Sequence, residues 1–161
     1  MGRGGSAPKD CHERALGLLA VRARSRHELE RRLLSAGFDA TGVADELTRL
    51  EGVGLLDDEA FARQVVEHGF GSRRDGRRAV AGALAAKGVA PSVATVVLDE
   101  VGGDEQQRAD ELASLRASRL QGLPPDRAAQ RLQGFLLRRG YGYEVTRQAV
   151  RKALDVPQVD D

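Results

Sequence analysis

The stretch RRDGRRAVAGALAAKG, residues 73–88, decides the expected fold. Val80 and Leu84 lie four residues apart, so a helix would place both on one face. Lys87 and Gly88 follow the last apolar residues, and glycine at this point can end a helix in the left-handed conformation. The stretch therefore predicts a basic helix with a buried apolar side.

The same plan occurs twice more, at residues 25–37 and 124–140. Each stretch carries its apolar pair eight and four residues before a closing glycine, and the three glycines are 51 and 52 residues apart. A fixed period of this size is typical of a tandem-repeat protein. The equivalent apolar pairs are Leu29 and Leu33, Val80 and Leu84, and Leu132 and Leu136.

Helical spacing of apolar residues before and after each basic stretch predicts nine helices in three groups of three. A unit of about 50 residues buries too little surface to be stable alone, so neighbouring units should share their cores by stacking. We expect an all-α protein of three tandem three-helix repeats in an elongated, curved body. The expected modules cover residues 10–53, 54–102 and 103–155, between a glycine-rich disordered tail at 1–9 and an acidic tail at 156–161.

The composition of the 161 residues agrees with packed helices, because aromatic residues are only 4% and tryptophan is absent. The single cysteine, Cys11, permits no intramolecular disulfide, which fits a reducing, intracellular setting. No apolar run approaches the roughly 18 residues of a membrane span, and residues 1–9 lack the apolar region of a signal peptide. We expect a monomeric, cytoplasmic protein without membrane contact.

Positive charge is concentrated on the element that repeats. The formal net charge is only +1, but residues 22–37 sum to +3, residues 71–88 to +4 and residues 124–140 to +3. The segments between them, 38–70 and 89–123, sum to −6 and −3. A row of such helices would form a discontinuous positive stripe, suited to a long polyanion or an acidic protein groove.

The expected binding residues are the cations of these three helices. An arginine-rich helix can also be a solvated face without a partner, but recurrence in all three modules favours binding. The arginine fork matches phosphate and carboxylate geometry, whereas scarce aromatic residues do not indicate base stacking. The candidates are Arg26, Arg31, Arg32, Arg73, Arg74, Arg77, Arg78, Lys87, Arg127, Arg131, Arg138 and Arg139.

No catalytic, cofactor or metal site is expected, because no nucleophile motif or phosphate-cradling glycine loop is present. The densest acidic cluster is Asp57-Asp58-Glu59. Consecutive residues on a helix do not face one another, so capping of the next helix by Asp57 or Asp58 is the preferred interpretation. Three glycines fall inside expected helices, and we interpret two of them, Gly82 and Gly134, as sites where a neighbouring helix comes close. The third is Gly76.

Two segments of the second module carry a family resemblance. GLLDDEAFAR at 54–63, followed by the basic run and LAAKGV at 84–89, resembles the RecX family of bacterial recombination regulators. SRHEL at 25–29 and LLSAGF at 33–38 resemble the first module of that family, while the third matches mainly in pattern. The resemblance covers roughly residues 11–154. Gly76 departs from it, because a larger residue would be usual inside a helix.

The resemblance implies an all-helical regulator that lodges in the groove of the RecA recombinase filament and inhibits its ATPase and strand exchange, with a role in DNA repair and the SOS response. It also implies non-sequence-specific contact with single- or double-stranded DNA. Two alternatives stay open: a helical DNA-binding protein that acts without RecA, and a scaffold for another protein. Sequence-specific reading is disfavoured, because the basic helices contain no Asn, and Gln130 and Gln133 lie only in the third.

Overall fold

The computed structural model describes residues 10–155, and this part of the chain is all-α, with no strand. Most helices start at a side-chain cap, as Asp10, Ser25, Asp39, Asp57 and Asp104 each accept a hydrogen bond from a first-turn amide. The elements are α1 (Cys11–Val21), α2 (Arg26–Ser35), α3 (Ala40–Gly52), α4 (Asp58–Phe70), α5 (Arg77–Ala86), α6 (Pro91–Val101), α7 (Glu105–Ala117), the 3₁₀ turn η1 (Ser118–Leu120), α8 (Pro125–Arg138) and α9 (Tyr143–Leu154).

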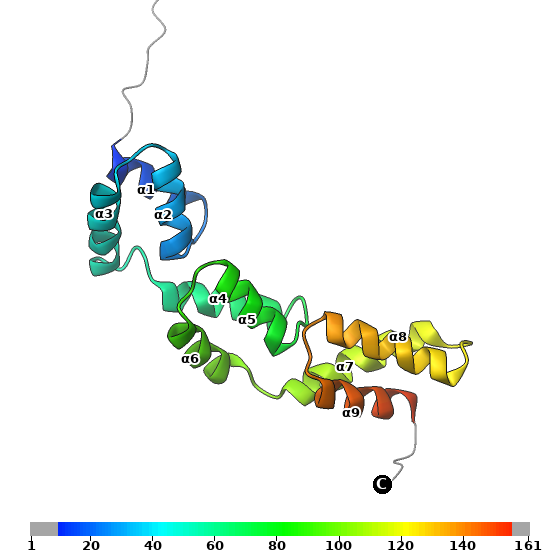
Figure 1. The fold of residues 1–161 in the computed structure, drawn as a ribbon. Coiled ribbons are helices and arrows are strands. Elements are labelled where there is room, and N and C mark those ends of the chain that lie inside the picture. Colours follow the sequence, from blue (N-terminus) through cyan, green and yellow to red (C-terminus); the bar gives the residue numbers. More distant parts are fainter. Residues whose placement is uncertain (1–9, 156–161) are drawn as a thin grey trace, which may run out of the picture.

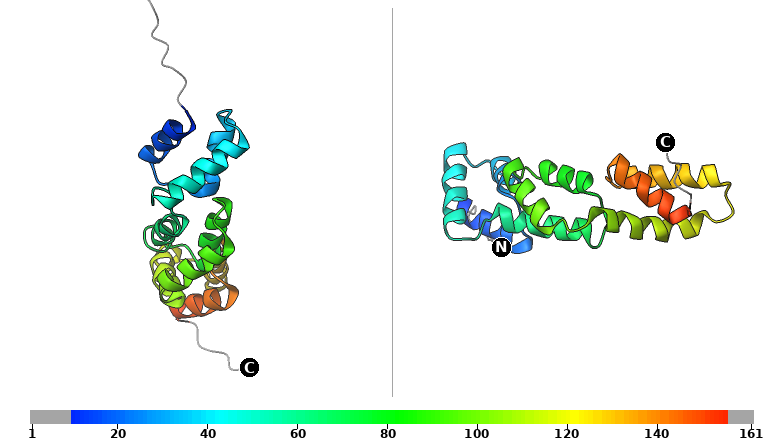
Figure 2. Two further views of the ribbon diagram at one scale, coloured as in Figure 1. Left: turned by 90° about the vertical axis from the view of Figure 1, so that its left-hand side faces the viewer. Right: turned by 90° about the horizontal axis from the view of Figure 1, so that it is seen from below.

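The helices form three groups of three that follow one another along a bent row (Figure 1). Figure 2 shows the same elongated arrangement from two further sides. Each group has its own core of leucine, valine and alanine with few aromatic residues. The three predicted apolar pairs all lie in these cores and are at most 2% exposed. The predicted all-α repeat fold and its register are therefore confirmed.

The middle helices α2, α5 and α8 line the inner side of the bend and meet head to tail (Figure 1). At the first junction, the Ser25 hydroxyl at the start of α2 donates to the Lys87 carbonyl at the end of α5, at 2.5 Å. At the second, the Gly76 amide at the start of α5 donates to the Arg139 carbonyl at the end of α8, at 2.7 Å. The starts of α2 and α5 thus each bind a carbonyl group at the end of the middle helix of the next module.

The closing glycines show why this contact needs glycine. Gly88 and Gly140 have φ of +73° and +91°, the left-handed conformation predicted for a helix end. A Cβ atom on Gly88 would lie 2.3 Å from the side chain of His27, and one on Gly140 would lie 2.4 Å from Ala79. Gly37 has the same conformation, at φ +96°, but nothing among the described residues within 4 Å of such an atom.

The predicted helix over residues 73–88 is wrong in its first turn. α5 begins only at Arg77, and Gly76 is its extended N-cap, with φ −79° and ψ 164°. The physical reason is the junction: a Cβ atom on Gly76 would lie 2.4 Å from the Gly140 backbone. Arg73 and Arg74 therefore lie in the loop before α5, and Arg74 is held at φ +53°.

The interpretation of Gly82 and Gly134 as close-approach sites is also wrong. A Cβ atom on Gly82 would meet nothing among the described residues within 4 Å. The nearest neighbour of one on Gly134 is the Arg138 side chain of the same helix, at 3.1 Å. Nothing in the structure explains glycine at these two positions. The tails at 1–9 and 156–161 lie outside the described residues.

Candidate partner-binding surface

Five of the twelve predicted binding residues form ion pairs within the protein. Arg26 pairs with Glu51 of α3, and Lys87 pairs with Glu28 across the first junction. Exposed pairs of this kind stabilise a fold only slightly, but a paired cation has less charge to offer a partner. The nitrogen–oxygen distances are 2.8 Å for Arg26–Glu51, 2.8 Å for Arg73–Asp75, 2.6 Å for Arg77–Asp99, 3.6 Å for Lys87–Glu28 and 3.4 Å for Arg139–Asp75.

The other seven predicted residues are exposed and make no ion pair with another residue of the 10–155 segment. They are spread over all three modules, on α2, on and just before α5, and on α8. An unpaired, solvated guanidinium can bind an incoming phosphate or carboxylate without first breaking an internal pair. These seven residues are Arg31, Arg32, Arg74, Arg78, Arg127, Arg131 and Arg138.

A groove of about 530 Å³ at the second junction brings four of the predicted cations together. Its apolar floor comes from the second module and includes Phe61, Val65 and Val80. The Lys87 ammonium group lies 5.9 Å from the centre of the Phe61 ring, within cation–π range. An apolar floor with a basic rim suits a partner that offers both acidic and apolar side chains. The four cations are Arg73, Lys87, Arg138 and Arg139.

A buried carboxylate, that of Asp75, organises the edge of this groove. Asp75 accepts a hydrogen bond from Arg73 at 2.8 Å and lies 3.4 Å from the guanidinium of Arg139 in the next module. The hydrogen bond to Asp75 raises the pKa of Arg73 above its ordinary value. The buried Tyr141 hydroxyl donates to the Arg74 carbonyl at 2.7 Å, and burial raises the pKa of Tyr141. The loop at 73–76 is therefore fixed from both modules.

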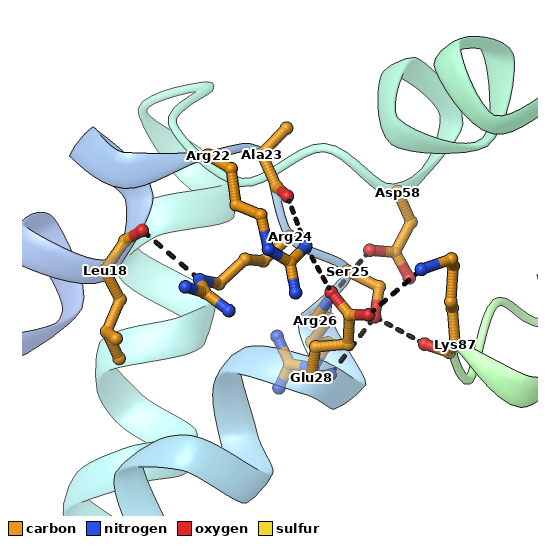
Figure 3. Close-up of polar contacts among 9 residues, drawn as sticks. All are labelled: Leu18, Arg22, Ala23, Arg24, Ser25, Arg26, Glu28, Asp58 and Lys87. Atoms are coloured by element: carbon orange, nitrogen blue, oxygen red, sulfur yellow. Dashed lines mark hydrogen bonds and ion pairs between the residues drawn. The ribbon is translucent and has the colours of Figure 1, made fainter. Parts of the chain in front are cut away.

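A second pocket, of about 300 Å³, lies at the first junction. It is lined by Arg31 and Arg32, which were predicted, and by Arg22 and Arg24, which were not. Figure 3 shows Arg22 and Arg24 beside Glu28, with Lys87 across the junction. The two missed residues belong to the turn between α1 and α2, outside the basic helix on which the prediction rests. Their signal in the sequence is that they lie three residues and one residue before the Ser25 cap.

Two acidic residues bind across the junctions, and sequence reasoning missed this role. Asp57 caps its own helix by accepting from Ala60, which confirms the capping interpretation. Asp58 instead accepts from the Arg26 amide of the first module, at 2.7 Å. Glu105, the first residue of α7, accepts from the Arg77 amide in the same way, at 2.8 Å. In both cases, the first helical residue of one module is an acid that accepts from the first N–H of the middle helix in the module before it.

The described residues contain no group of three or more His, Cys, Asp or Glu side chains that could hold a metal ion. Burial, followed by the charge of Glu46, raises the pKa of the Cys11 thiol above its ordinary value, so this thiol is not activated for nucleophilic chemistry. Within residues 10–155, no helix is both long and apolar enough to cross a membrane.

Family models match all three helical groups. The model described as "RecX, first three-helix domain" matches residues 11–50, the second three-helix domain matches 57–98, and the third matches 104–150. The matched segments follow the same order as in the bent row. They cover the buried residues of the three cores except Leu56, and both of the middle helices that meet at each junction.

Curated relatives agree over most of the chain. "Regulatory protein RecX" of Mycolicibacterium smegmatis is 41% identical over 140 residues, which is 84% of this chain and 74% of the relative. The protein of the same name from Streptomyces coelicolor is 33% identical over 156 residues, 94% of this chain and 83% of the relative. These names support a regulatory role.

Solved structures share the fold. The crystal structure of RecX from Lactobacillus salivarius has a TM-score of 0.79 at 20% identity and matches 89% of this chain and 94% of its own. A crystal structure of a regulatory protein RecX has a TM-score of 0.76 at 24% identity, over 86% of this chain and 70% of its own. From its three domain matches and its curated relatives, the chain belongs to the RecX family.

Proposed function

We propose that this protein is a non-enzymatic regulator that binds a RecA–DNA filament and lowers its ATP hydrolysis and strand exchange. The observation that supports the proposal most is the recurrence of unpaired arginines on three middle helices that run head to tail. Arg32, Arg78 and Arg131 represent the three modules in this row. A filament repeats along its length, so a protein that repeats its contacts can engage several protomers at once.

The arrangement of charge also supports this function. The exposed arginines are distributed over three middle helices that follow one another along the row, which suits a long polyanion. The groove at the second junction adds an apolar floor beside Arg73 and Arg138. A partner that combines nucleic acid with protein would use both features, whereas free DNA would use only the arginines.

The experiment titrates the protein into RecA assembled on single-stranded DNA, and follows ATP hydrolysis and DNA pairing. We expect inhibition at fewer copies than RecA protomers. Replacing Arg78, Arg131 and Arg138 by alanine should weaken inhibition and lower the salt slope of binding by about one for each lost phosphate contact. Arg119→Ala, which removes one exposed charge from the turn η1, serves as the control.

Three outcomes separate the candidates. No inhibition at equimolar protein, at a salt concentration where binding is demonstrated, would refute the regulatory mechanism. Equal affinity for DNA with and without RecA would favour a helical DNA-binding protein that acts alone. Weaker inhibition with an unchanged salt slope would mean that the three arginines meet protein carboxylates and not phosphates.

A further inference from the structure

The side chain of Arg24 is buried without a counter-ion. Arg24 is only 6% exposed, although charged side chains are almost never buried unless they are paired. Its Nε atom donates to the Leu18 carbonyl at 3.2 Å. Its Nη1 atom is buried and has no hydrogen-bond partner among residues 10–155. Such a group destabilises a fold unless a water molecule, an ion or a ligand satisfies it.

The surroundings of Arg24 increase the excess of positive charge. Arg22, Arg31 and Arg32 line the same pocket, with His27 on its wall. The single carboxylate of the lining, Glu28, lies 3.3 Å from Arg22 and 3.6 Å from Lys87, so cations already surround it. Burial lowers the pKa of Arg24, and the charges of Arg22 and Arg32 lower it further.

We propose that this pocket binds a phosphate group. Four arginines line it, and a guanidinium group presents a fork of N–H donors that matches phosphate. Arg22 already donates to the Ala23 carbonyl and to Glu28, and Arg24 to the Leu18 carbonyl. Arg31 and Arg32 are instead exposed. A carboxylate has two oxygen atoms and one charge, and can satisfy few of these donors. A phosphate group offers more oxygen atoms in a tetrahedral array and can bridge several arginines at once. Arg24 lines the pocket, and a phosphate group there would supply the anionic partner that its side chain lacks among residues 10–155.

The first module supplies most of the pocket, and one lining residue, Ala86, comes from the second module. Arg22 and Arg24 come from the turn before α2, Arg31 and Arg32 from α2 itself, and Ala86 from the end of α5. The docked state is held by the Ser25 hydroxyl on the Lys87 carbonyl (Figure 3). Phosphate binding should therefore stabilise this junction as well as the pocket. The inference depends on the pocket alone and needs no recombinase.

The phosphate can come from a nucleic-acid backbone or from a free nucleotide, and separate ligands distinguish the two. Thermal unfolding of the full chain is measured with sodium phosphate, ADP, a twelve-residue oligothymidylate and sodium acetate, each at matched ionic strength. At ten times its dissociation constant, a ligand should shift the folding equilibrium about elevenfold. Tighter binding of the oligonucleotide indicates a backbone phosphate, and tighter binding of ADP indicates a nucleotide. Equal stabilisation by acetate would overturn the proposal.

The decisive variant is Arg24→Met, which keeps the length of the side chain and removes its charge. We expect phosphate to shift the folding equilibrium of this variant by less than twofold. Without phosphate, the melting temperature of the variant should equal or exceed that of the original protein. Arg119→Met, the matched control, should keep the full shift. A lower melting temperature with an unchanged phosphate response would show that Arg24 is purely structural and overturn the proposal. If Arg24→Met does not fold, Arg31→Ala with Arg32→Ala tests the same pocket, and an unchanged phosphate shift in that variant would equally overturn it.

Discussion

Replacing Gly140 by alanine should separate the second module from the third, whereas replacing Gly37 should not. Both glycines end a middle helix in the left-handed conformation, with φ of +91° and +96°. They differ in their surroundings. A Cβ atom on Gly140 would lie 2.4 Å from both the Cβ atom and the backbone nitrogen of Ala79, and one on Gly37 would meet nothing among the described residues within 4 Å.

The expected difference follows from three contributions. The left-handed backbone costs about 1–2 kcal/mol for any residue with a Cβ atom, and this applies to both variants. Overpacking against Ala79 adds about 1–3 kcal/mol at Gly140 alone. If the clash is relieved by opening, the Gly76–Arg139 and Arg78–Gly140 hydrogen bonds are lost, at about 1 kcal/mol each. Because the left-handed cost is common to both variants, and the clash and its relief by opening are alternatives, Gly140→Ala should lose about 1–3 kcal/mol more than Gly37→Ala.

Urea unfolding measures the loss of stability, and amide hydrogen exchange locates it. Exchange at the Gly76 and Arg78 amides, which donate across the junction, should accelerate in Gly140→Ala and not in Gly37→Ala. Small-angle scattering should show a changed overall shape only for Gly140→Ala. Equal losses of stability in the two variants, with equal exchange at these amides, would refute the view that the glycine is required by the junction.

Three further predictions concern the core and the junctions. Leu84→Ala should lower the free energy of unfolding by about 2–5 kcal/mol, because Leu84 is fully buried, and an unchanged thermal transition would contradict this. Asp58→Ala should lower stability by about 1.5–3 kcal/mol through loss of its bond to the Arg26 amide, with faster exchange at that amide as the readout. Burial raises the pKa of Tyr141 above its ordinary value of 10.0. The stability that this shift contributes to the folded state is therefore complete below about pH 10 and falls as the pH rises further. Tyr141→Phe should flatten this alkaline decline in melting temperature; an identical decline would exclude Tyr141 as its cause.

Local spacing was sufficient to predict the three modules, because each module's core is made within about 50 residues. Leu29 and Leu33, for example, are buried by α3 and α1 of their own group. The positive-φ glycines were predictable for the same reason, since a helix end needs one wherever the chain must turn back. Helical spacing could not predict where α5 starts. The Asp75-Gly76 pair is typical of a turn, but α5 starts after it because Gly76 packs against Gly140, which lies far along the chain.

The candidate surface was predicted less well than the fold, because a count of charges does not show where their partners lie. Arg73 and Arg77 were predicted to face a ligand, yet each binds a carboxylate of its own module. Arg24 was not predicted at all, because its burial results from packing that its neighbours in the sequence do not reveal. The exposed residues on the middle helices, such as Arg78, lie where helical spacing places them.

The repeat departs from its own pattern at the two outer ends of the row, and each departure concerns the junction contact. At the inner junctions, an acid begins the following module and binds the first amide of the preceding middle helix, as Asp58 and Glu105 do. The first module begins instead with Cys11, and no described module lies before it. At the other end, α8 begins with Pro125, which has no N–H for such an acid to bind. Pro125 thus lacks the N–H that Arg26 and Arg77 offer to Asp58 and Glu105, so the acid–amide contact that joins α4 to α2 and α7 to α5 cannot be repeated at the start of α8.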